Sequence, residues 1–441
     1  MKKIILQISV LLSTFIGYSQ NPICPIGTYI ADPTARVWSD GKLYIYGSTD
    51  ESPTYWCSYN HDVLYTADIK KWDLKQNVFS SKGESDAVKE TDALLFAPDA
   101  MYHDGLFYLY FCTPDKKYSE GVAVAKSPLG PFLDAKKLNT TKYNEIDPTV
   151  FVDDDGQSYY YWGQSNLKGA KLKSNMTELD ETSIQENLLN TNEHYFHEGS
   201  FVFKRNNIYY VLYAHEGRRD CRPTSLGYAT SNSPLGPFSY KGVVIDNFGC
   251  DPETWNNHGS IAEFKNQWYV FYHRSSQGSK IMRRACVEPI HFNIDGTIEE
   301  VEMTSQGAGN PLDAFSKIEA ERACLLNGYC RINLVETNNE AVCSIKNGDE
   351  AVYKYIDFGS GVSLFKAKIH SYNGGTINLR IGSPTGNIIG SLEINPLNKL
   401  RKYETFSCKI DTIEGVHALF LEFVGAEKGS MLFDLDSFQF E

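Results

Sequence analysis

The feature that most constrains this chain is a strand-like segment that recurs five times, at intervals of 51 to 64 residues. Each copy opens on a turn residue, has tyrosine three positions later and continues with β-branched and aromatic residues, which predicts a strand. The copies are G-K-L-Y-I-Y-G from Gly41, G-L-F-Y-L-Y-F from Gly105, G-Q-S-Y-Y-Y-W from Gly156, N-I-Y-Y-V-L-Y from Asn207 and N-Q-W-Y-V-F-Y from Asn266. A second strand-like segment follows each copy. Units this small cannot bury their own faces, so the repetition predicts a five-bladed β-propeller; a long β-sandwich is the alternative.

The rhythm stops near Thr304, where the stretch T-S-Q-G-A-G-N-P-L-D is small, polar and typical of a linker. Alternating strand patterns then resume with a different spacing up to Glu441, which favours a β-sandwich of the jelly-roll kind. We therefore predict an all-β chain with a signal peptide at 1–20, a propeller at 21–303, a linker at 304–316 and a β-sandwich at 317–441.

The N-terminus has the pattern of a secretory signal: M-K-K, a short apolar run, and small residues near Gly17 and Ser19. We expect export to the periplasm or the medium. No later stretch reaches 18 apolar residues, so no membrane span is expected. All ten cysteines follow this segment, and export permits disulfides. Cys221 with Cys250 is one candidate pair, although spacing does not set the connectivity.

Charge and aromatic content narrow the class of partner. The chain has 42 Lys and Arg against 55 Asp and Glu, a net charge of −13. Nucleic-acid binding rests on clustered cations that neutralise phosphates, so this balance argues against it. Aromatic residues make up 13% of the chain. Their flat apolar faces suit sugars, although sheets also use aromatic residues for packing.

Three acids occupy one position of the repeat. Asp32, Asp147 and Glu198 each lie nine residues before the turn residue that opens repeats one, three and four. Equivalent positions of a propeller are related by rotation, so we expect these carboxyls to meet at one mouth of the central channel. Phe96 and Asn257 hold the position in repeats two and five. Clustered carboxyls separate their pKa values, as glycoside hydrolysis requires, whereas a single acid beside a turn could merely cap structure.

Several ordered strings resemble glycoside hydrolase family 43 between Cys24 and Val301. They are A-D-P-T-A-R-V-W at the start, A-P-D in the second repeat, I-D-P-T-V-F-V-D-D-D-G in the third, H-E-G-S in the fourth, N-H-G-S in the fifth and R-R-A-C-V-E-P-I-H-F-N-I-D-G-T-I at the end. The resemblance implies an inverting hydrolase, in which Asp32 is the general base, Glu198 the general acid and Asp147 the residue that tunes and orients the acid.

The same resemblance assigns further residues. Arg283 would lie near the sugar and the base, with its neighbour Arg284 as the competing assignment. His258 matches an axial histidine that helps to hold a metal, commonly calcium, or water; the alternative is a hydrogen-bonded core histidine. The chemistry itself would need no cofactor. Phe96 stands where the family often has tryptophan, and it would stack on a sugar face without an indole donor. Residues 55–59 and 216–223 are candidate pocket walls or surface loops.

The second domain, from about Phe315 to Glu441, resembles carbohydrate-binding module family 6. That resemblance implies a structural calcium held by Glu319, Glu321 and Asp436; the alternative is that these acids are solvated. Tyr403 stands where the binding-loop tryptophan is usual, and no tryptophan follows Trp268. We therefore interpret the module mainly as a structural partner of the propeller.

These inferences predict an exo-acting, inverting glycosidase for arabinose- or xylose-containing polysaccharides and oligosaccharides, most narrowly an α-L-arabinofuranosidase or a β-D-xylosidase. A galactan-cleaving relative is the nearest enzymatic alternative, although in that branch the base position often lacks an ordinary Asp, so Asp32 counts against it. A non-catalytic sugar-binding propeller is the alternative from another class, since a fold does not fix function.

Overall fold

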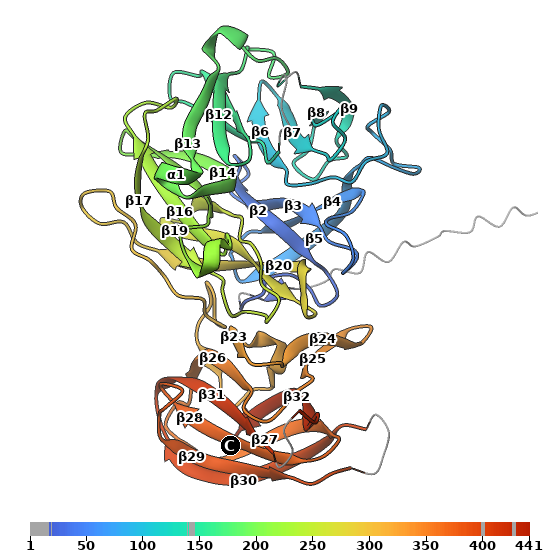
Figure 1. Ribbon diagram of the computed structural model, residues 1–441, viewed down its shortest axis with the longest axis vertical. Coiled ribbons are helices and arrows are strands. Elements are labelled where there is room, and N and C mark those ends of the chain that lie inside the picture. Colours follow the sequence, from blue (N-terminus) through green and yellow to red (C-terminus); the bar gives the residue numbers. More distant parts are fainter. Residues whose placement is uncertain (1–16, 19, 139, 141–145, 398–401, 426–428) are drawn as a thin grey trace, which may run out of the picture.

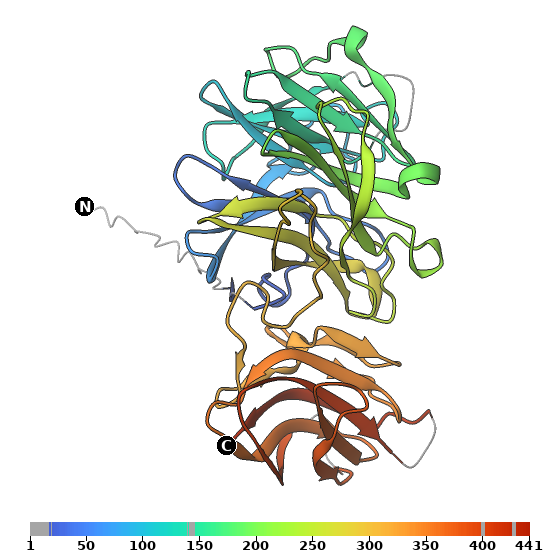
Figure 2. The same cartoon turned by 90° about the vertical axis from the view of Figure 1, so that its left-hand side faces the viewer.

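The computed structural model describes residues 17–18, 20–138, 140, 146–397, 402–425 and 429–441. Most of the predicted signal peptide lies outside these ranges, at residues 1–16 and 19. Among the described residues, no helix is long and apolar enough to cross a membrane. Figures 1 and 2 show two bodies joined end to end, a ring of small sheets and a two-layered sandwich.

Each predicted repeat strand is the second strand of a separate antiparallel sheet. The first and second sheets contain β2 (Ile30–Val37), β3 (Leu43–Thr49), β4 (Asn60–Thr66) and β5 (Lys71–Ser80), then β6 (Asp99–His103), β7 (Leu106–Cys112), β8 (Glu120–Ala125) and β9 (Leu133–Lys137). The third and fourth contain β10 (Thr149–Val152), β11 (Ser158–Trp162), β12 (Asn166–Lys171) and β13 (Gln185–Asn190), then β14 (Phe196–Arg205), β15 (Ile208–His215), β16 (Ser225–Ser231) and β17 (Ser239–Asp246). The fifth contains β18 (Ser260–Phe264), β19 (Gln267–Ser276) and β20 (Ser279–Ile290), and β1 (Gly17–Tyr18) pairs with β5.

The five sheets close into a ring. The first strands β2, β6, β10, β14 and β18 each contact the first strand of the next sheet, and β18 returns to β2. Five clusters of buried apolar side chains fill the spaces between neighbouring sheets, so every blade buries its faces against two others. The prediction of a five-bladed propeller is confirmed, and the first strands line its axis.

The chain start completes the fifth blade. The backbone N–H of Ile23 donates to the carbonyl of Ala285 in β20 at 2.9 Å. The side chain of Asn21 reaches the same strand, donating to the carbonyl of Val287 at 3.0 Å and accepting from its N–H at 2.8 Å. The ring is therefore closed by a segment from the opposite end of the repeat array.

Residues after the fifth blade form the predicted β-sandwich. One sheet contains β21 (Leu312–Asp313), β23 (Leu325–Asn327), β26 (Glu350–Asp357), β28 (Gly375–Ile381), β29 (Ile388–Ile394) and β31 (Val416–Val424). The other contains β22 (Ile318–Glu319), β24 (Arg331–Glu336), β25 (Asn339–Cys343), β27 (Val362–Ser371), β30 (Glu404–Ile413) and β32 (Phe433–Phe440). A single apolar cluster fills the space between them. Helical structure is confined to α1 (Thr191–His194), η1 (Glu181–Ser183), η2 (Arg219–Cys221) and η3 (Ala320–Arg322) within the described residues.

The sandwich is hydrogen-bonded to the propeller through the turn between β19 and β20. Arg284 of β20 forms a buried ion pair with Glu340 of β25, at 2.5 Å. Gln277 donates from its side chain to Glu340 at 3.1 Å, and its backbone N–H bonds the carbonyl of Ile332 at 2.9 Å. The two bodies therefore share a polar, largely buried contact.

The candidate disulfide between Cys221 and Cys250 is not formed. All ten cysteines are free thiols, with Cys221 exposed and Cys250 buried. The Cys250 sulfur lies 3.2 Å from the hydroxyl of Thr254, inside the core between blades four and five. Cys112 and Cys286 are buried, as expected of small apolar residues inside strands.

Candidate active site

One pocket of about 270 Å³ opens at the ring axis. Its walls come from all five blades and include every acid of the shared repeat position. The lining residues are Asp32, Trp56, Cys57, Phe96, Ala97, Ile146, Asp147, Gln164, His197, Glu198, Trp255, Asn256, His258 and Arg283. The structure therefore brings together the three predicted catalytic residues, the two predicted sugar-binding residues and His258.

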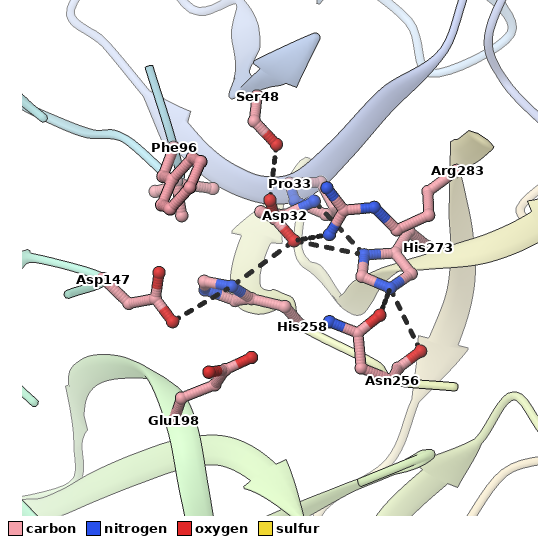
Figure 3. Close-up of polar contacts among 12 residues, drawn as sticks. Asp32, Pro33, Ser48, Phe96, Asp147, Glu198, Asn256, His258, His273 and Arg283 are labelled. Carbon is pink, nitrogen blue, oxygen red and sulfur yellow. Dashed lines mark hydrogen bonds and ion pairs between the residues drawn. The ribbon is translucent and has the colours of Figure 1, made fainter. Parts of the chain in front are cut away.

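Irregular backbone aims the acids into the pocket. Asp32 and Asp147 have φ angles of 52° and 58°, a left-handed conformation that aspartate tolerates better than most residues. The pairing of β2 with β3 shifts register between Ala31 and Thr34, around Asp32. The pairing of β14 with β15 shifts on both sides of Glu198. Bulges of this kind re-aim side chains beside active sites, and Figure 3 shows the three carboxyls around the same space.

The family-like strings also lock neighbouring blades together. Arg36 of the first string donates to Asp99 of the A-P-D string from both Nε, at 2.9 Å, and Nη2, at 2.5 Å. Asp99 also accepts from the hydroxyl of Thr149 at 2.9 Å, and so joins blade three. Ser260 of the N-H-G-S string donates to the carbonyl of Pro33 at 2.7 Å. The strings thus hold the first strands in place around the acids.

Asp32 is buried among cationic and polar groups. Its Oδ1 lies 2.8 Å from Nη1 of Arg283, and its Oδ2 accepts from the hydroxyl of Ser48. Burial alone would raise the pKa of Asp32, but the Arg283 guanidinium, with His273 and His258 nearby, holds that pKa well below its usual value. Asp32 is therefore ionised at neutral pH, which suits a base.

His273 fixes the backbone of Asp32. The N–H of Asp32 donates to Nδ1 of His273 at 3.2 Å, while Nε2 lies 3.1 Å and 3.2 Å from the backbone and side-chain oxygens of Asn256 (Figure 3). This pattern places the ring proton on Nε2. Burial lowers the pKa of His273, in agreement with a neutral ring.

Arg283, and not Arg284, enters the pocket. The two side chains leave β20 on opposite faces, as alternation along a strand requires, and Arg284 pairs with Glu340 of the sandwich. Arg283 also forms a two-pronged pair with Asp50, from Nε at 3.0 Å and Nη2 at 2.9 Å. Sequence reasoning missed Asp50, whose only signal is an acid directly after the first repeat strand.

Asp147 and Glu198 form the opposite wall of the pocket. Burial, and then the negative charges of Glu198 and Asp32, raise the pKa of Asp147 well above its usual value. Glu198 accepts a hydrogen bond on Oε2 from Nε2 of Gln164 at 2.6 Å. Nε2 of His197 lies 3.8 Å from the same oxygen. The repeat pattern did not point to Gln164 or His197. Gln164 lies in a loop, and His197 lies one residue before the repeat position that Glu198 shares with Asp32 and Asp147.

His258 lies at the centre of the acid cluster. Its Nδ1 is 3.5 Å from Oδ1 of Asp32 and 4.0 Å from Oδ2 of Asp147, and Figure 3 shows it between them. Burial lowers the pKa of His258. Within the described ranges, no three His, Cys, Asp or Glu side chains are grouped to share a metal ion. The metal contact expected of His258 stays a prediction.

Of the two segments predicted as pocket walls or surface loops, residues 55–59 form part of the wall and residues 216–223 do not. Trp56 and Cys57 of residues 55–59 line the pocket, whereas no residue of 216–223 does. Arg218 and Arg219 of that loop instead pair with Glu300 and Asp246 outside the pocket. Trp255, which sequence reasoning missed, is 41% exposed at the mouth.

The acids predicted to hold calcium in the sandwich lie in different environments. Within the part of the chain that the structure describes, Glu319 Oε2 and both carboxyl oxygens of Glu321 are buried without a hydrogen-bond partner, whereas Glu319 Oε1 pairs with Lys317. Asp436 instead accepts from Asn339 at 2.6 Å and lies 3.1 Å from the ammonium of Lys368.

Comparison with known proteins identifies the family. The model of glycosyl hydrolases family 43 matches residues 19–298, and the model of carbohydrate binding module family 6 matches residues 319–441. The chain belongs to glycosyl hydrolases family 43. It is therefore a glycoside hydrolase, and the family expected from the sequence strings is confirmed.

Individual relatives span both parts of the chain. An arabinoxylan arabinofuranohydrolase of Paenibacillus polymyxa is 29% identical over 93% of this chain and 72% of its own length. A xylosidase/arabinosidase of Thermoclostridium stercorarium is 28% identical over 93% of this chain and 97% of its own. The crystal structure of a Bacillus subtilis family 43 arabinoxylan arabinofuranohydrolase with cellotetraose is similar with a TM-score of 0.57 and 27% identity, covering 96% of this chain and 99% of that one.

Proposed function

We propose that this glycoside hydrolase removes terminal α-L-arabinofuranosyl or β-D-xylosyl units from arabinoxylan-type polysaccharides, with inversion at the anomeric carbon. The observation that carries the proposal is the pocket in which Asp32, Asp147 and Glu198 converge. Its volume of about 270 Å³ is below the roughly 300–1,000 Å³ of typical ligand sites, which favours a single sugar ring over a chain segment. The named activities of the relatives, an arabinofuranohydrolase and a xylosidase/arabinosidase, support the sugar class.

In the proposed mechanism, ionised Asp32 takes a proton from water as the water oxygen bonds to the anomeric carbon. The bond between the anomeric carbon and the leaving oxygen breaks, and its electron pair stays on that oxygen. The leaving oxygen then carries the proton that Glu198 gives it. Arg283 keeps Asp32 charged for this step. Asp147 lies beside Glu198, and burial together with the negative charge of Glu198 raises the pKa of Asp147. In the proposed mechanism Asp147 tunes and orients the acid. Phe96 offers an apolar face to the sugar.

Two assays test this function. Release of nitrophenol from aryl α-L-arabinofuranoside and aryl β-D-xyloside should separate the two sugars, with aryl β-D-galactoside as the control for a galactan-cleaving enzyme. NMR of the sugar first formed from a glycan substrate should show the inverted anomer. Binding of polysaccharide without release of any sugar would favour the non-catalytic propeller, and a retained anomer would contradict the assigned base.

We also propose that Glu319, Glu321 and Asp436 hold a calcium ion in the C-terminal module. Among the described residues, three of the four carboxyl oxygens of Glu319 and Glu321 are buried without a hydrogen-bond partner, and burial raises the pKa of Glu321 to about 7. A hard cation with oxygen ligands would supply the missing charge and contacts. Removal of calcium by EDTA should lower the Tm, and added calcium should restore it; a Tm that ignores both would contradict the site.

Export is the proposed location. The basic start and apolar run of residues 1–16 support a cleaved signal, and polymeric plant glycans are met outside the cell. Mass spectrometry of the protein recovered from culture medium or periplasm should find a chain that begins near Asn21. A full-length chain retained in the cytoplasm would contradict this proposal.

A further inference from the structure

Two residues that the catalytic scheme does not use, Gln164 and His197, lie against one carboxyl oxygen of the acid Glu198. Gln164 donates from Nε2 to Oε2 of Glu198 at 2.6 Å. The imidazole Nε2 of His197 lies 3.8 Å from the same Oε2. Among the described residues, the polar contacts of this carboxyl fall on Oε2, so Oε1 is the oxygen left for a proton directed at substrate.

The irregular pairing of β14 explains how two consecutive side chains reach the pocket. Phe196 pairs with His215 and Glu198 with Ala214, so one extra residue stands in β14 between the two pairs. Consecutive residues of a regular strand point to opposite faces, whereas a bulge brings them to the same side. Both His197 and Glu198 accordingly line the pocket.

A second carboxyl orients the imidazole. Nδ1 of His197 lies 2.9 Å from Oε2 of Glu216, the residue that follows β15, and the backbone N–H of Glu216 bonds the carbonyl of Tyr195 at 3.0 Å. Glu216 is not a lining residue of the pocket. A carboxylate that accepts from Nδ1 fixes the ring and directs Nε2 toward Glu198, as carboxylate–histidine pairs do in other sites.

We propose that Gln164 and the His197–Glu216 pair are positioning residues for the general acid: they hold Oε2 of Glu198 and so direct the proton on Oε1 to the leaving oxygen. This inference rests on the proposed function. When Glu198 gives up that proton, its new negative charge is met on Oε2 by the amide N–H of Gln164, while the His197–Glu216 pair stays beside the same oxygen and keeps the carboxyl in place. Donors placed where charge develops lower the barrier of a reaction.

Dependence on the leaving group tests the proposal. A sugar leaving group needs its proton from the acid, whereas nitrophenolate departs readily without it. We expect Gln164→Met and Glu216→Gln each to lower kcat on an arabinoxylo-oligosaccharide by about 10–100-fold, with KM little changed, and to lower kcat on 4-nitrophenyl α-L-arabinofuranoside much less. A merely structural role would lower both equally.

Glu193→Gln is the matched control for Glu216→Gln, because Glu193 is exposed on α1 and contacts Asn190 outside the pocket; it should leave both rates unchanged. Equal losses on the two substrates, or no loss on either, would overturn the proposal. Should Gln164→Met fail to fold in a melting experiment, Glu216→Gln, whose side chain is 19% exposed, decides alone. A wild-type enzyme inactive on both of these substrates, and also on aryl β-D-xyloside and xylo-oligosaccharides, would instead refute the proposed function.

Discussion

Two consecutive residues of β20 enter buried charge networks of opposite character. Arg284 faces the sandwich and meets one carboxylate, Glu340, in a pair whose side chains are 1% and 0% exposed. Arg283 faces the pocket and meets two, Asp32 and Asp50, with Asp147 and Glu198 close by. The interface pair is balanced one to one, whereas the pocket keeps an excess of carboxyls over cations.

The difference separates a structural from a chemical use of buried charge. A buried ion pair can be neutral in its effect on stability when each partner satisfies the other. An excess of buried carboxyls forces pKa values apart, so that Asp32 stays ionised while Asp147 resists ionisation. The separation of pKa values leaves Asp32 as an ionised base and Asp147 as a carboxyl that keeps its proton more readily. Burying these carboxyls together lowers the stability of the folded protein.

The largest expected effect is the loss of the base. Asp32→Asn removes the carboxylate that takes the proton from water, so kcat should fall by about 10²–10⁴-fold in the nitrophenol assay. Asp62→Asn is the matched control, because Asp62 is a buried acid of β4 that bonds the N–H of Asn77 outside the pocket. Wild-type turnover in Asp32→Asn, or an equal loss in the control, would remove Asp32 from the mechanism.

Substitution in the Arg284–Glu340 pair between the two domains should change the stability of the protein. Arg284→Met leaves Glu340 buried without its cation and should lower the free energy of unfolding by about 3–5 kcal/mol, measured by denaturant titration. The double variant Arg284→Met/Glu340→Leu should recover most of that loss, because both charges are then gone.

The same substitution at an exposed pair provides the control. Arg218 pairs with Glu300 at 2.7 Å, with side chains 38% and 45% exposed, and Arg218→Met should cost only ~0–1 kcal/mol. A single Arg284 variant as stable as this control would show that the interface pair does not hold the two bodies together.

Rotational symmetry decides how much could be predicted from the sequence. It relates repeat positions to places around one axis, so five strand copies predicted five sheets and one shared position predicted the meeting of Asp32, Asp147 and Glu198. Asp50 and Gln164 break the symmetry, since they occur in single loops with no counterpart at the shared address. For Arg283 and Arg284, strand alternation predicts one side chain inward and one outward, but only the packing of the sandwich settles which.

The smallest expected effect is a gain in stability at the pocket. The pKa of Asp147 is raised above the ordinary 3.8, so between these two values the folded protein binds more protons than the unfolded chain. The free energy of unfolding therefore falls as pH rises from about 4 toward the raised pKa. The total loss is about 1.4 kcal/mol for each pH unit between the pKa of Asp147 in the unfolded chain and in the folded protein. Asp147→Asn abolishes that slope, and its Tm at pH 7 should exceed that of wild type by ~2–4 °C per kcal/mol, while activity falls. Burial likewise raises the pKa of Asp62 from 3.8 to about 6, so the stability that Asp62→Asn gains over wild type should grow between these pH values, persist above pH 6 and leave activity unchanged. Were Asp147→Asn less stable than wild type at pH 7, the excess of carboxyls would not carry the cost assigned to it.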